Sequence, residues 1–533
     1  MHGVISAPEP EAVEAGADAL RDGGNAVDAA VACAFAQGVV DPPMSGIGGW
    51  GTMQVFLAEP RAHVTIDFYA TAPAAARPDM WADKLVGQTR DGWGFLVEGA
   101  ENEVGYKAIA TPGTLAGLSE VHARFGRLPW ARVIEPAIAL AEQGFLLRPH
   151  FHRFLVGPSV MGRAAPRDKM RFSETGRRLY YNENGEAKPQ GSRIRNPDLG
   201  RTLRRIAAEG AQTFYRGEMA REMVADIQAH GGILALEDLA TYAPRWREPA
   251  WSTYRGRRIS SNQPPGGGIV LLEMLNILDN FPLEAMAHNS PDYVRLVAEA
   301  MKCAMADKDR YVGDPEFVDV PVGRFLDKAY AAAVAEKIRD GERFSVTRLN
   351  ASEGKHTTTV SVLDEQGNAV AMTHSLGMVS GAVTEGMGFF YNGAMGVFDP
   401  RPGHAASIAP GKRRYTSACP TFVFEGDTPS LVIGAPGGAH IANAVLQGLL
   451  NAIDFRMSLS EAVAAPRFSA ASDKIDVCNR IPHATERALA AEGYEVVRSF
   501  KSFDFAEVHA VGRTSRGWVG GADPAADGMA LAV

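Results

Sequence analysis

Two parts of different composition meet near residue 355 of this chain, and no linker separates them. Residues from about 115 to 345 carry the apolar spacing of helices, whereas the chain from Thr357 onward is rich in β-branched residues grouped as strands. A Ser/Gly-rich linker would be typical of a boundary between independent domains, and none is found. We therefore predict that the two parts fold together as one interwoven domain.

Periodicity and turn residues predict the main elements. The opening segment is predicted to form a helix that ends at Gly23-Gly24, and Asn25 is predicted to cap the next helix. The expected helices are Ala26–Gln37, Leu128–Gln143, Arg216–Ala229, Pro291–Tyr311 and Ala439–Ile453. The expected strands are Gly51–Leu57 and Ala62–Tyr69, with two hairpins, Thr357–Leu363 with Ala369–Ser375 and Thr421–Phe424 with Ser430–Ile433.

Composition excludes several classes of protein. The formal net charge of −8 argues against nucleic acid or an anionic membrane as the partner. No apolar run approaches the ~18 residues of a membrane helix, and the N-terminus does not resemble a secretory signal, so a cytoplasmic location is expected. The 4 cysteines are scattered, which predicts buried free thiols rather than a disulfide framework or a zinc site.

The 56 glycines gather in short strings, each beside an apolar segment. The strings are Gly46–Gly51, Pro264–Gly268 and Gly434–Gly438. Glycine in such positions indicates that the backbone approaches another group closely. The string at 434–438 precedes a predicted helix, so it either relieves crowding there or presents backbone N–H groups to an anion or oxyanion.

Seven short motifs follow one another along nearly the whole chain, namely Gly23–Ala30, Thr111–Thr114, Pro264–Gly268, Tyr311–Pro315, Thr357–Val362, Pro436–Gly438 and Ala465–Phe468. Their order resembles that of the γ-glutamyltranspeptidase family of N-terminal-nucleophile hydrolases. In the segment that begins at Thr357, Thr359 stands where the family has a histidine. Each motif alone is weak, and it is their order along the chain that identifies the family.

The resemblance implies self-cleavage between His356 and Thr357. Thr357 would then be an N-terminal nucleophile whose own α-amine, with an ordinary pKa of about 7.7–8, acts as general base. Gly437 and Gly438 would stabilise the oxyanion, and Ser375 stands where the family has a threonine that supports the nucleophile. No metal or organic cofactor is expected.

The resemblance also implies the α+β fold of these hydrolases, a four-layer αββα sandwich. Two stacked antiparallel sheets would lie between helical layers, with residues 1–356 as a helix-rich large subunit and 357–533 as the catalytic small subunit. The two fragments would stay together as a heterodimer, or as a dimer of heterodimers, and bind a small amide substrate.

The sequence departs from the family where the glutamyl group is recognised. Tyr69 occupies the position of the arginine that clamps the substrate carboxylate, and Gly377 that of an asparagine. Asp399 corresponds to the acid that meets the substrate α-amine, and Thr416-Ser417 to a serine pair. A neutral phenol cannot replace a bidentate guanidinium, whose charge-assisted pair contributes roughly 1.5–3 kcal/mol.

A replacement cation cannot come from the start of the second part, because no lysine or arginine occurs from Thr357 to Pro400. It would have to come from Arg401, from Lys412–Arg414 or from the first part of the chain. We therefore expect the acyl-transfer machinery to be retained and the glutamyl pocket to be altered.

Three substrate classes remain open from the sequence. The protein could transfer γ-glutamyl groups with a rebuilt pocket, resemble the cephalosporin acylases, or resemble oxamate amidohydrolase. A different alternative is a non-catalytic binding protein that kept the fold. Thr357, Ser375 and Gly437-Gly438 argue against that alternative.

Overall fold

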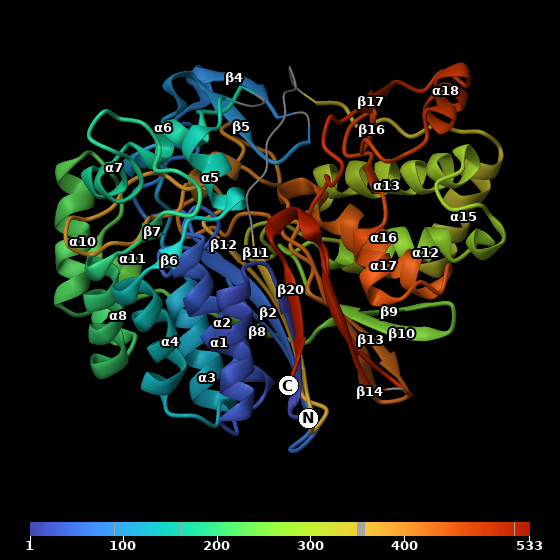
Figure 1. Cartoon of the computed structure of the whole chain (residues 1–533). Coiled ribbons are helices and arrows are strands. Elements are labelled where there is room, and N and C mark those ends of the chain that lie inside the picture. The colour runs from blue at the N-terminus through green and yellow to red at the C-terminus, as the bar shows by residue number, and fades with distance from the viewer. Residues whose placement is uncertain (90, 160–161, 349–357, 516) are drawn as a thin grey trace.

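Two antiparallel sheets lie face to face with helices on both outer sides (Figure 1). The computed structural model describes residues 1–89, 91–159, 162–348, 358–515 and 517–533, so His356 and Thr357 lie outside the described residues. The first sheet has the order β20 (Met529–Ala532), β1 (Gly3–Ala7), β11 (Thr358–Asp364), β12 (Ala369–Ser375), β2 (Trp50–Leu57), β3 (Ala62–Phe68) and β8 (Arg245–Arg247). The second has the order β19 (Gly517–Ala522), β18 (His509–Thr514), β14 (Thr428–Gly434), β13 (Thr421–Glu425), β10 (Arg257–Ser261) and β9 (Ala250–Tyr254).

Alternation along the strands divides the interior into layers. On β11, Val360 and Val362 point into the core under one set of helices, whereas Leu363 joins the layer between the sheets. Phe422 and Phe424 enter that middle layer from β13 of the second sheet. The two sheets are therefore buried on both faces, which confirms the predicted αββα arrangement.

Helices of different origin cover the two outer faces. The first sheet is covered by α1 (Pro10–Arg21), α2 (Ala26–Val40), α3 (Thr114–Phe125), α4 (Trp130–Gln143), α8 (Pro197–Glu209) and α10 (Glu218–Ala229). The second is covered by α12 (Gly268–Leu278), α13 (Pro291–Tyr311), α15 (Lys328–Arg339), α16 (Ile441–Ile453), α17 (Leu459–Ala464) and α18 (His483–Ala491). Shorter elements are α5 (Pro149–Val156), α6 (Pro166–Met170), α7 (Glu174–Tyr180), α9 (Gln212–Tyr215), α11 (Leu236–Ala240), α14 (Val322–Leu326), β4 (Leu85–Gln88), β5 (Phe95–Val97), β6 (Phe145–Leu146), β7 (Arg193–Ile194), β15 (Phe468–Ser469), β16 (Ile475–Val477) and β17 (Val496–Arg498).

Most predicted elements occur within a few residues of their expected bounds. The helix Pro291–Tyr311 matches at both ends, and the second hairpin is β13 with β14. Several strands were missed, among them β8, β18, β19 and β20 as well as β1 and the β9–β10 hairpin. The five residues of β1 are all buried, so they show no alternation, and β9 with β10 form a hairpin of short strands inside the part expected to be mainly helical.

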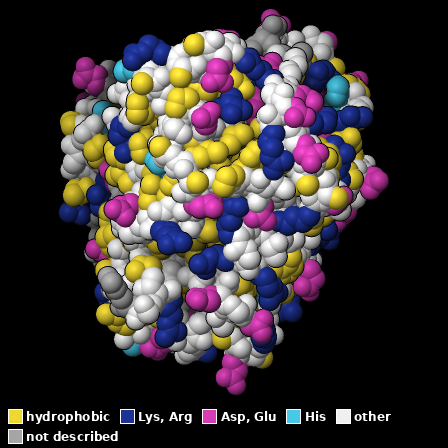
Figure 2. All heavy atoms as spheres, turned by 90° about the vertical axis from the view of Figure 1, so that its right-hand side faces the viewer, with side chains coloured by type: hydrophobic (Ala, Val, Ile, Leu, Met, Phe, Trp, Pro, Cys, Tyr) yellow, Lys and Arg dark blue, Asp and Glu magenta, His cyan; other side chains and the backbone are white. Residues whose placement is uncertain are grey.

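Surface and cysteine chemistry agree with the composition. Among the described residues, no helix is both long and apolar enough to cross a membrane. All four cysteines are buried free thiols, as predicted. On the face shown in Figure 2, basic and acidic side chains are interspersed rather than gathered by sign.

The start of α2 explains the motif Gly23–Ala30 near the beginning of the chain. The Asn25 side chain accepts hydrogen bonds from the N–H groups of Val27 and Asp28, and the Asp28 carboxylate accepts one from Asn25 N–H at 2.8 Å. That carboxylate also accepts from the N–H groups of Arg127 and Leu128 at 3.0–3.1 Å. Asp28 thus closes the capping box and anchors the loop that follows α3.

Replacing Asp28 by alanine is expected to destabilise the protein by about 3 kcal/mol or more, because several buried N–H groups lose their acceptor together. The urea midpoint should fall accordingly. Asp18→Ala on the neighbouring helix α1 is the control, since Asp18 makes an exposed ion pair with Arg21 worth at most ~0.5 kcal/mol. Equal midpoints for the two variants would contradict the anchoring role.

Candidate active site

The open end of the β11–β12 hairpin is where the predicted catalytic residues gather. Thr358 pairs with His374 and Thr359 with Thr373, so Ser375 is the next residue of β12. The Ser375 hydroxyl accepts a hydrogen bond from Gly377 N–H at 2.7 Å. The predicted nucleophile is bonded to Thr358 but lies outside the described residues.

The third glycine string lies against this hairpin end. A Cβ on Gly434 would be 2.6 Å from Thr359 Oγ1, so only glycine lets the end of β14 approach β11 this closely. Gly437 and Gly438 have φ values of +138° and +60°, which L side chains rarely adopt. They turn the chain into a short 3₁₀ turn that leads into α16. The two predicted oxyanion glycines thus follow directly from a strand end that contacts β11.

The first glycine string supports Ser375 from the other side. A Cβ on Gly49 would be 2.4 Å from the Ser375 carbonyl oxygen, and one on Gly51 would be 2.7 Å from that of Thr373. These glycines allow the start of β2 to lie directly on the end of β12. The close approach of Gly49 is to protein backbone, and that of Gly51 is also to the Phe68 ring, 2.5 Å from the Cβ position.

The second string meets Tyr69 and the Thr416-Ser417 pair. The Asn262 side-chain amide donates to the Tyr69 hydroxyl at 3.0 Å, and a Cβ on Gly267 would be 2.5 Å from the Ser417 carbonyl oxygen. Tyr69 is fully buried, and burial raises the pKa of its phenol well above the ordinary value. Tyr69 is therefore a neutral group whose hydroxyl oxygen already accepts a hydrogen bond from Asn262.

Trp50, Arg414 and Trp93 connect these groups to one another. The Arg414 guanidinium lies over the rings of Trp50 and Trp93, with its carbon 4.2 and 4.4 Å from their centroids. A Cβ on Gly377 would be 3.0 Å from Trp50 Nε1 and 3.3 Å from Arg414 Nη1. Gly438 lies on the far side, where an added Cβ would contact Trp93 at 3.6 Å. Ser375, Gly377 and the oxyanion string are thus linked by these three side chains.

Asp399 takes a different position from the other predicted residues. Its two carboxylate oxygens accept from Arg401 Nε and Nη2 at 2.9 and 2.7 Å. The residue is buried, and its carboxylate is already paired with a cation. Any substrate amine would have to compete with Arg401 for it.

Sequence reasoning missed a buried polar network behind the hairpin. Gln37 Nε2 donates to Glu9 Oε2 and to Thr358 Oγ1, both at 2.9 Å. Gln37 Oε1 accepts from His374 Nε2 at 2.8 Å. One side chain from α2 therefore holds the first described residue of β11 and its partner on β12.

The charges in this network are suppressed by burial. Burial lowers the pKa of His374 to about 3, so the ring is neutral and its Nε2 carries the proton donated to Gln37. Burial and the neighbouring Asp41 raise the pKa of Glu9 well above its ordinary value, and burial raises that of Asp41 to about 7. The sequence feature that could have revealed this network is Gln37, a polar residue within the largely apolar segment of α2.

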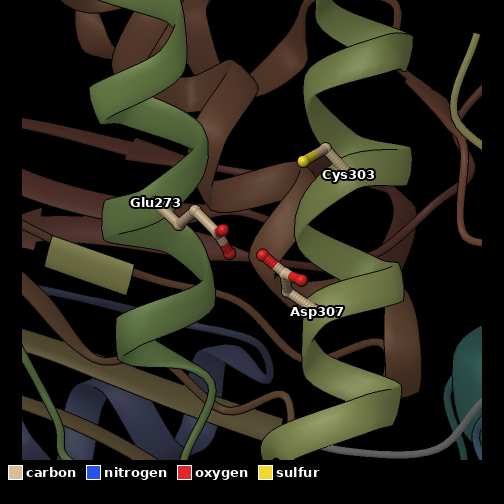
Figure 3. Close-up of side chains that lie close together, drawn as sticks. All are labelled: Glu273, Cys303 and Asp307. Atoms are coloured by element: carbon tan, nitrogen blue, oxygen red, sulfur yellow. The ribbon is translucent and has the colours of Figure 1, made fainter. Parts of the chain in front are cut away.

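Among the described residues, one group of side chains could hold a metal ion. Glu273 on α12 faces Cys303 and Asp307 on α13 (Figure 3), and their ligand atoms lie within 4.8 Å of one another. Asp307 accepts a hydrogen bond from Tyr330 at 2.6 Å and pairs with Arg324. None of the predicted site residues belongs to this cluster.

Protonation of Glu273 accounts for the close carboxyl pair. Burial raises the pKa of Glu273 well above its ordinary value, and the charge of Asp307 raises it further. A proton on Glu273 removes its repulsion with Asp307, whose own charge is balanced by Arg324. The cluster fits a buried acid pair within the helical layer.

Sequence comparison identifies relatives along most of the chain. A family model described as gamma-glutamyltranspeptidase matches residues 12–533. An acylase ACY 1 proenzyme from Pseudomonas sp. (strain V22) is 40% identical over 503 residues, which cover 93% of this chain and 88% of the relative. A glutathione hydrolase proenzyme from Escherichia coli (strain K12) is 33% identical over 517 residues, covering 93% and 86% of the two chains.

Structural comparison gives the same result. The crystal structure of a cephalosporin acylase from Bacillus halodurans superposes with a TM-score of 0.87 at 29% identity. The match covers 100% of this chain and 96% of that one. The whole arrangement of sheets and helices is therefore shared.

The acid pair on α12 and α13 predicts a pH-dependent stability. Because the pKa of Glu273 is raised in the folded state, the folded chain holds a proton that the unfolded chain releases as the pH rises. Glu273→Gln keeps the shape without the titration, so its urea midpoint should rise relative to the parent between pH 5 and pH 8. The gain should be about 1.4 kcal/mol for each pH unit above the unfolded pKa, until the folded pKa is reached. Glu14→Gln, on the exposed side of α1, should show no such trend, and a pH-independent Glu273→Gln difference would contradict the assignment.

Proposed function

The chain belongs to the γ-glutamyltranspeptidase family of N-terminal-nucleophile amide hydrolases and transferases, and from that premise we propose that Thr357 is its nucleophile. The Thr357 hydroxyl would attack the carbonyl of residue 356 in the uncut chain, giving an ester as the peptide nitrogen is released. Water would hydrolyse that ester, which leaves Thr357 as a new N-terminus with a free amine.

The free amine would then act as the general base in each turnover. It takes the hydroxyl proton of Thr357 while the oxygen adds to the amide carbon of the substrate. The C–N bond breaks, the leaving amine takes the proton, and an acyl ester remains on the threonine. Water or a second amine attacks that ester and restores the enzyme. Gly437 and Gly438 would donate backbone hydrogen bonds to the oxyanion in both steps.

The observation that supports this mechanism is that groups from four different elements meet at the open end of the β11–β12 hairpin. The third glycine string contacts Thr359, Ser375 lies at the end of β12, and Gln37 holds Thr358. These groups come from α2, β11, β12 and β14, which are distant in sequence. A self-processing site needs such rigid supports around a nucleophile.

We place the substrate among small amides other than glutathione. Tyr69 replaces the arginine of the family pattern, and its hydroxyl is bound by Asn262. Asp399, the acid expected to meet an α-amine, is paired with Arg401. The greater identity to an acylase proenzyme than to the glutathione hydrolase proenzymes supports the same preference.

Self-cleavage is tested first. The purified protein should run as two fragments, with the smaller one beginning Thr-Thr-Thr-Val, and Thr357→Ala should remain a single chain without amide hydrolysis. Thr357→Ser retains a hydroxyl and should cut itself more slowly. A small fragment with another N-terminus, or efficient cleavage of Thr357→Ala, would reject Thr357 as the nucleophile.

Gln37 is expected to act as a positioning residue. Gln37→Leu removes the donor to Thr358 Oγ1 and the acceptor for His374, so self-cleavage in a translation time course should slow by about tenfold or more. Gln447→Leu is the matched control, because Gln447 is an equally buried helical glutamine that binds Phe468 and the backbone of α16. Both variants should lose stability, but only Gln37→Leu should slow cleavage. Equal cleavage rates would mean that Gln37 is merely structural.

A further inference from the structure

Two consecutive residues near the end of the chain have a strained backbone. Phe505 and Ala506 have φ values of +66° and +71°, in the left-handed region that residues with a Cβ rarely occupy. Both are buried, with 6% and 1% of the residue exposed. Glycine would adopt this conformation without cost, so contacts with the surrounding protein must hold it here.

The next residue orients the Pro436–Gly437 peptide of the third glycine string. Glu507 N–H donates a hydrogen bond to the Pro436 carbonyl oxygen at 3.1 Å. The peptide is trans, and in a trans peptide the C=O and N–H bonds point in opposite directions. Gly437 N–H therefore points away from Glu507, and no hydrogen-bond partner for it is found among the described residues. One of the two proposed oxyanion donors is thus aimed by Glu507 and left available.

The two strained residues contact the rest of the same turn. A Cβ on Gly437 would lie 2.3 Å from Ala506 Cβ and 2.5 Å from Ala506 Cα, so these residues are in direct contact. The Phe505 ring packs against His440, with the ring centroids 5.5 Å apart. His440 N–H donates to the Gly437 carbonyl oxygen at 3.2 Å and closes the turn. The segment 505–507 therefore contacts the turn at both of its ends.

A buried ion pair holds the segment from behind. Arg467 Nη2 donates to the Ala506 carbonyl oxygen at 2.9 Å and pairs with the Asp523 carboxylate. Both charged residues are buried, and Asp523 N–H donates to the carbonyl oxygen of Val508 at 3.1 Å. Arg467 belongs to the motif Ala465–Phe468, which has no part in the proposed acyl transfer. Its contact with Ala506 connects that motif to the oxyanion turn.

The strain is concentrated at this point of the chain. Among the described residues, no other two consecutive non-glycine residues have positive φ values. Strain of this kind persists only where the surrounding structure imposes it, and it is typical of active sites. Three consecutive residues, each in contact with the turn, are therefore held in a conformation that the chain would not adopt alone.

We propose that the segment 505–507 is a brace that holds the oxyanion turn in its reactive orientation, with Ala506 as a positioning residue. The brace aims Gly437 N–H before substrate binds, so this donor need not reorient as negative charge forms on the carbonyl oxygen. It acts when the acyl ester forms and when it is hydrolysed, because both steps pass through an oxyanion. This inference rests on the proposed function and adds to it the residues that position the oxyanion donor.

The test changes the conformational preference at residue 506. Ala506→Val introduces a β-branched side chain that disfavours positive φ and presses on Gly437, so kcat for amide hydrolysis should fall about 30- to 100-fold. Because formation and hydrolysis of the acyl ester are slowed together, KM should stay within about twofold. Ala506→Gly adopts positive φ freely and should keep kcat within about twofold. The substrate is the 4-nitroanilide that the wild type hydrolyses fastest among acyl, carboxyacyl and γ-glutamyl compounds.

Two further variants separate positioning from stability. Ala100→Val is the matched control, because Ala100 is another alanine with positive φ, +53°, outside the segment. It should lose stability as Ala506→Val does, and it should keep the wild-type kcat. Ala506→Asn keeps the test decisive if Ala506→Val does not fold, since asparagine tolerates positive φ. Its larger side chain lies against Gly437, so kcat should still fall about fivefold at unchanged KM.

Amide hydrogen exchange measures the brace without turnover. In the wild type and in Ala506→Gly, the Glu507 N–H should exchange slowly because it is bound to the Pro436 carbonyl oxygen. In Ala506→Val it should exchange at least tenfold faster. Exchange at the wild-type rate together with a large loss of kcat would contradict the brace, since the turn would then be intact.

The outcomes for the brace and for the proposed function are distinct. If Ala506→Val and Ala506→Asn both keep the wild-type kcat, the brace is rejected and the proposed function stands. A raised KM at unchanged kcat would assign Ala506 to substrate binding, and an equal loss of kcat in Ala100→Val would reduce the effect to stability; each rejects the positioning role. A wild type that neither cuts itself nor hydrolyses any anilide would reject the proposed function itself.

Discussion

Hydrogen-bonded pairing between strands from the two sides of the predicted cut is the constraint on which the rest of the structure depends. In the first sheet β11 lies against β1, and β12 lies against β2, while in the second sheet β10 lies against β13. Neither part of the chain can complete either sheet alone. Breaking a single bond at residues 356–357 leaves all of these ladders in place, so the fragments would remain one folded body. A new N-terminus could then be created inside the protein without dismantling the site that uses it.

Close contacts made at glycines bring the supports together at that point. Gly49 and Gly51 let β2 lie on β12, and Gly434 lets the second sheet approach Thr359. In each case a Cβ would fall within 3 Å of a neighbouring atom. Gly438 differs, because its Cβ would make only an ordinary contact with Trp93 while its φ of +60° disfavours a side chain. Packing therefore selects most of these glycines, and backbone conformation selects Gly438.

The sequence predicts local structure well where a helix-capping residue stands at the start of a segment with helical apolar periodicity. The bounds of α13 follow from Ser290 as cap, proline at the first turn and a continuous helical period. The buried strand β1 carries no period of two, so the same reasoning could not find it.

The residues of the candidate site also fall into those that the sequence could predict and those that it could not. The residues that lie in the family motifs could be predicted from the sequence. The roles of Gln37 and Arg414 could not, because they depend on contacts with residues distant in sequence. Arg413 and Arg414 are adjacent, yet among the described residues Arg413 is paired with Asp314 and the Arg414 guanidinium has no hydrogen-bond partner.

Tyr69, Gly377 and Arg414 lie around one side chain, Trp50, so their sizes and charges constrain one another. Trp50 lies 6.0 Å from the Tyr69 ring and 4.2 Å from the Arg414 guanidinium carbon. An arginine at 69 in addition to Arg414 would bring two positive charges to one buried indole, where the low dielectric makes repulsion strong. A side chain at 377 would press on Trp50 Nε1 and Arg414 Nη1, which lie 3.0 and 3.3 Å from the Cβ position. A neutral phenol and a glycine are thus the residues compatible with a guanidinium at 414. The positive charge beside the hairpin end thus comes from the loop that precedes β13.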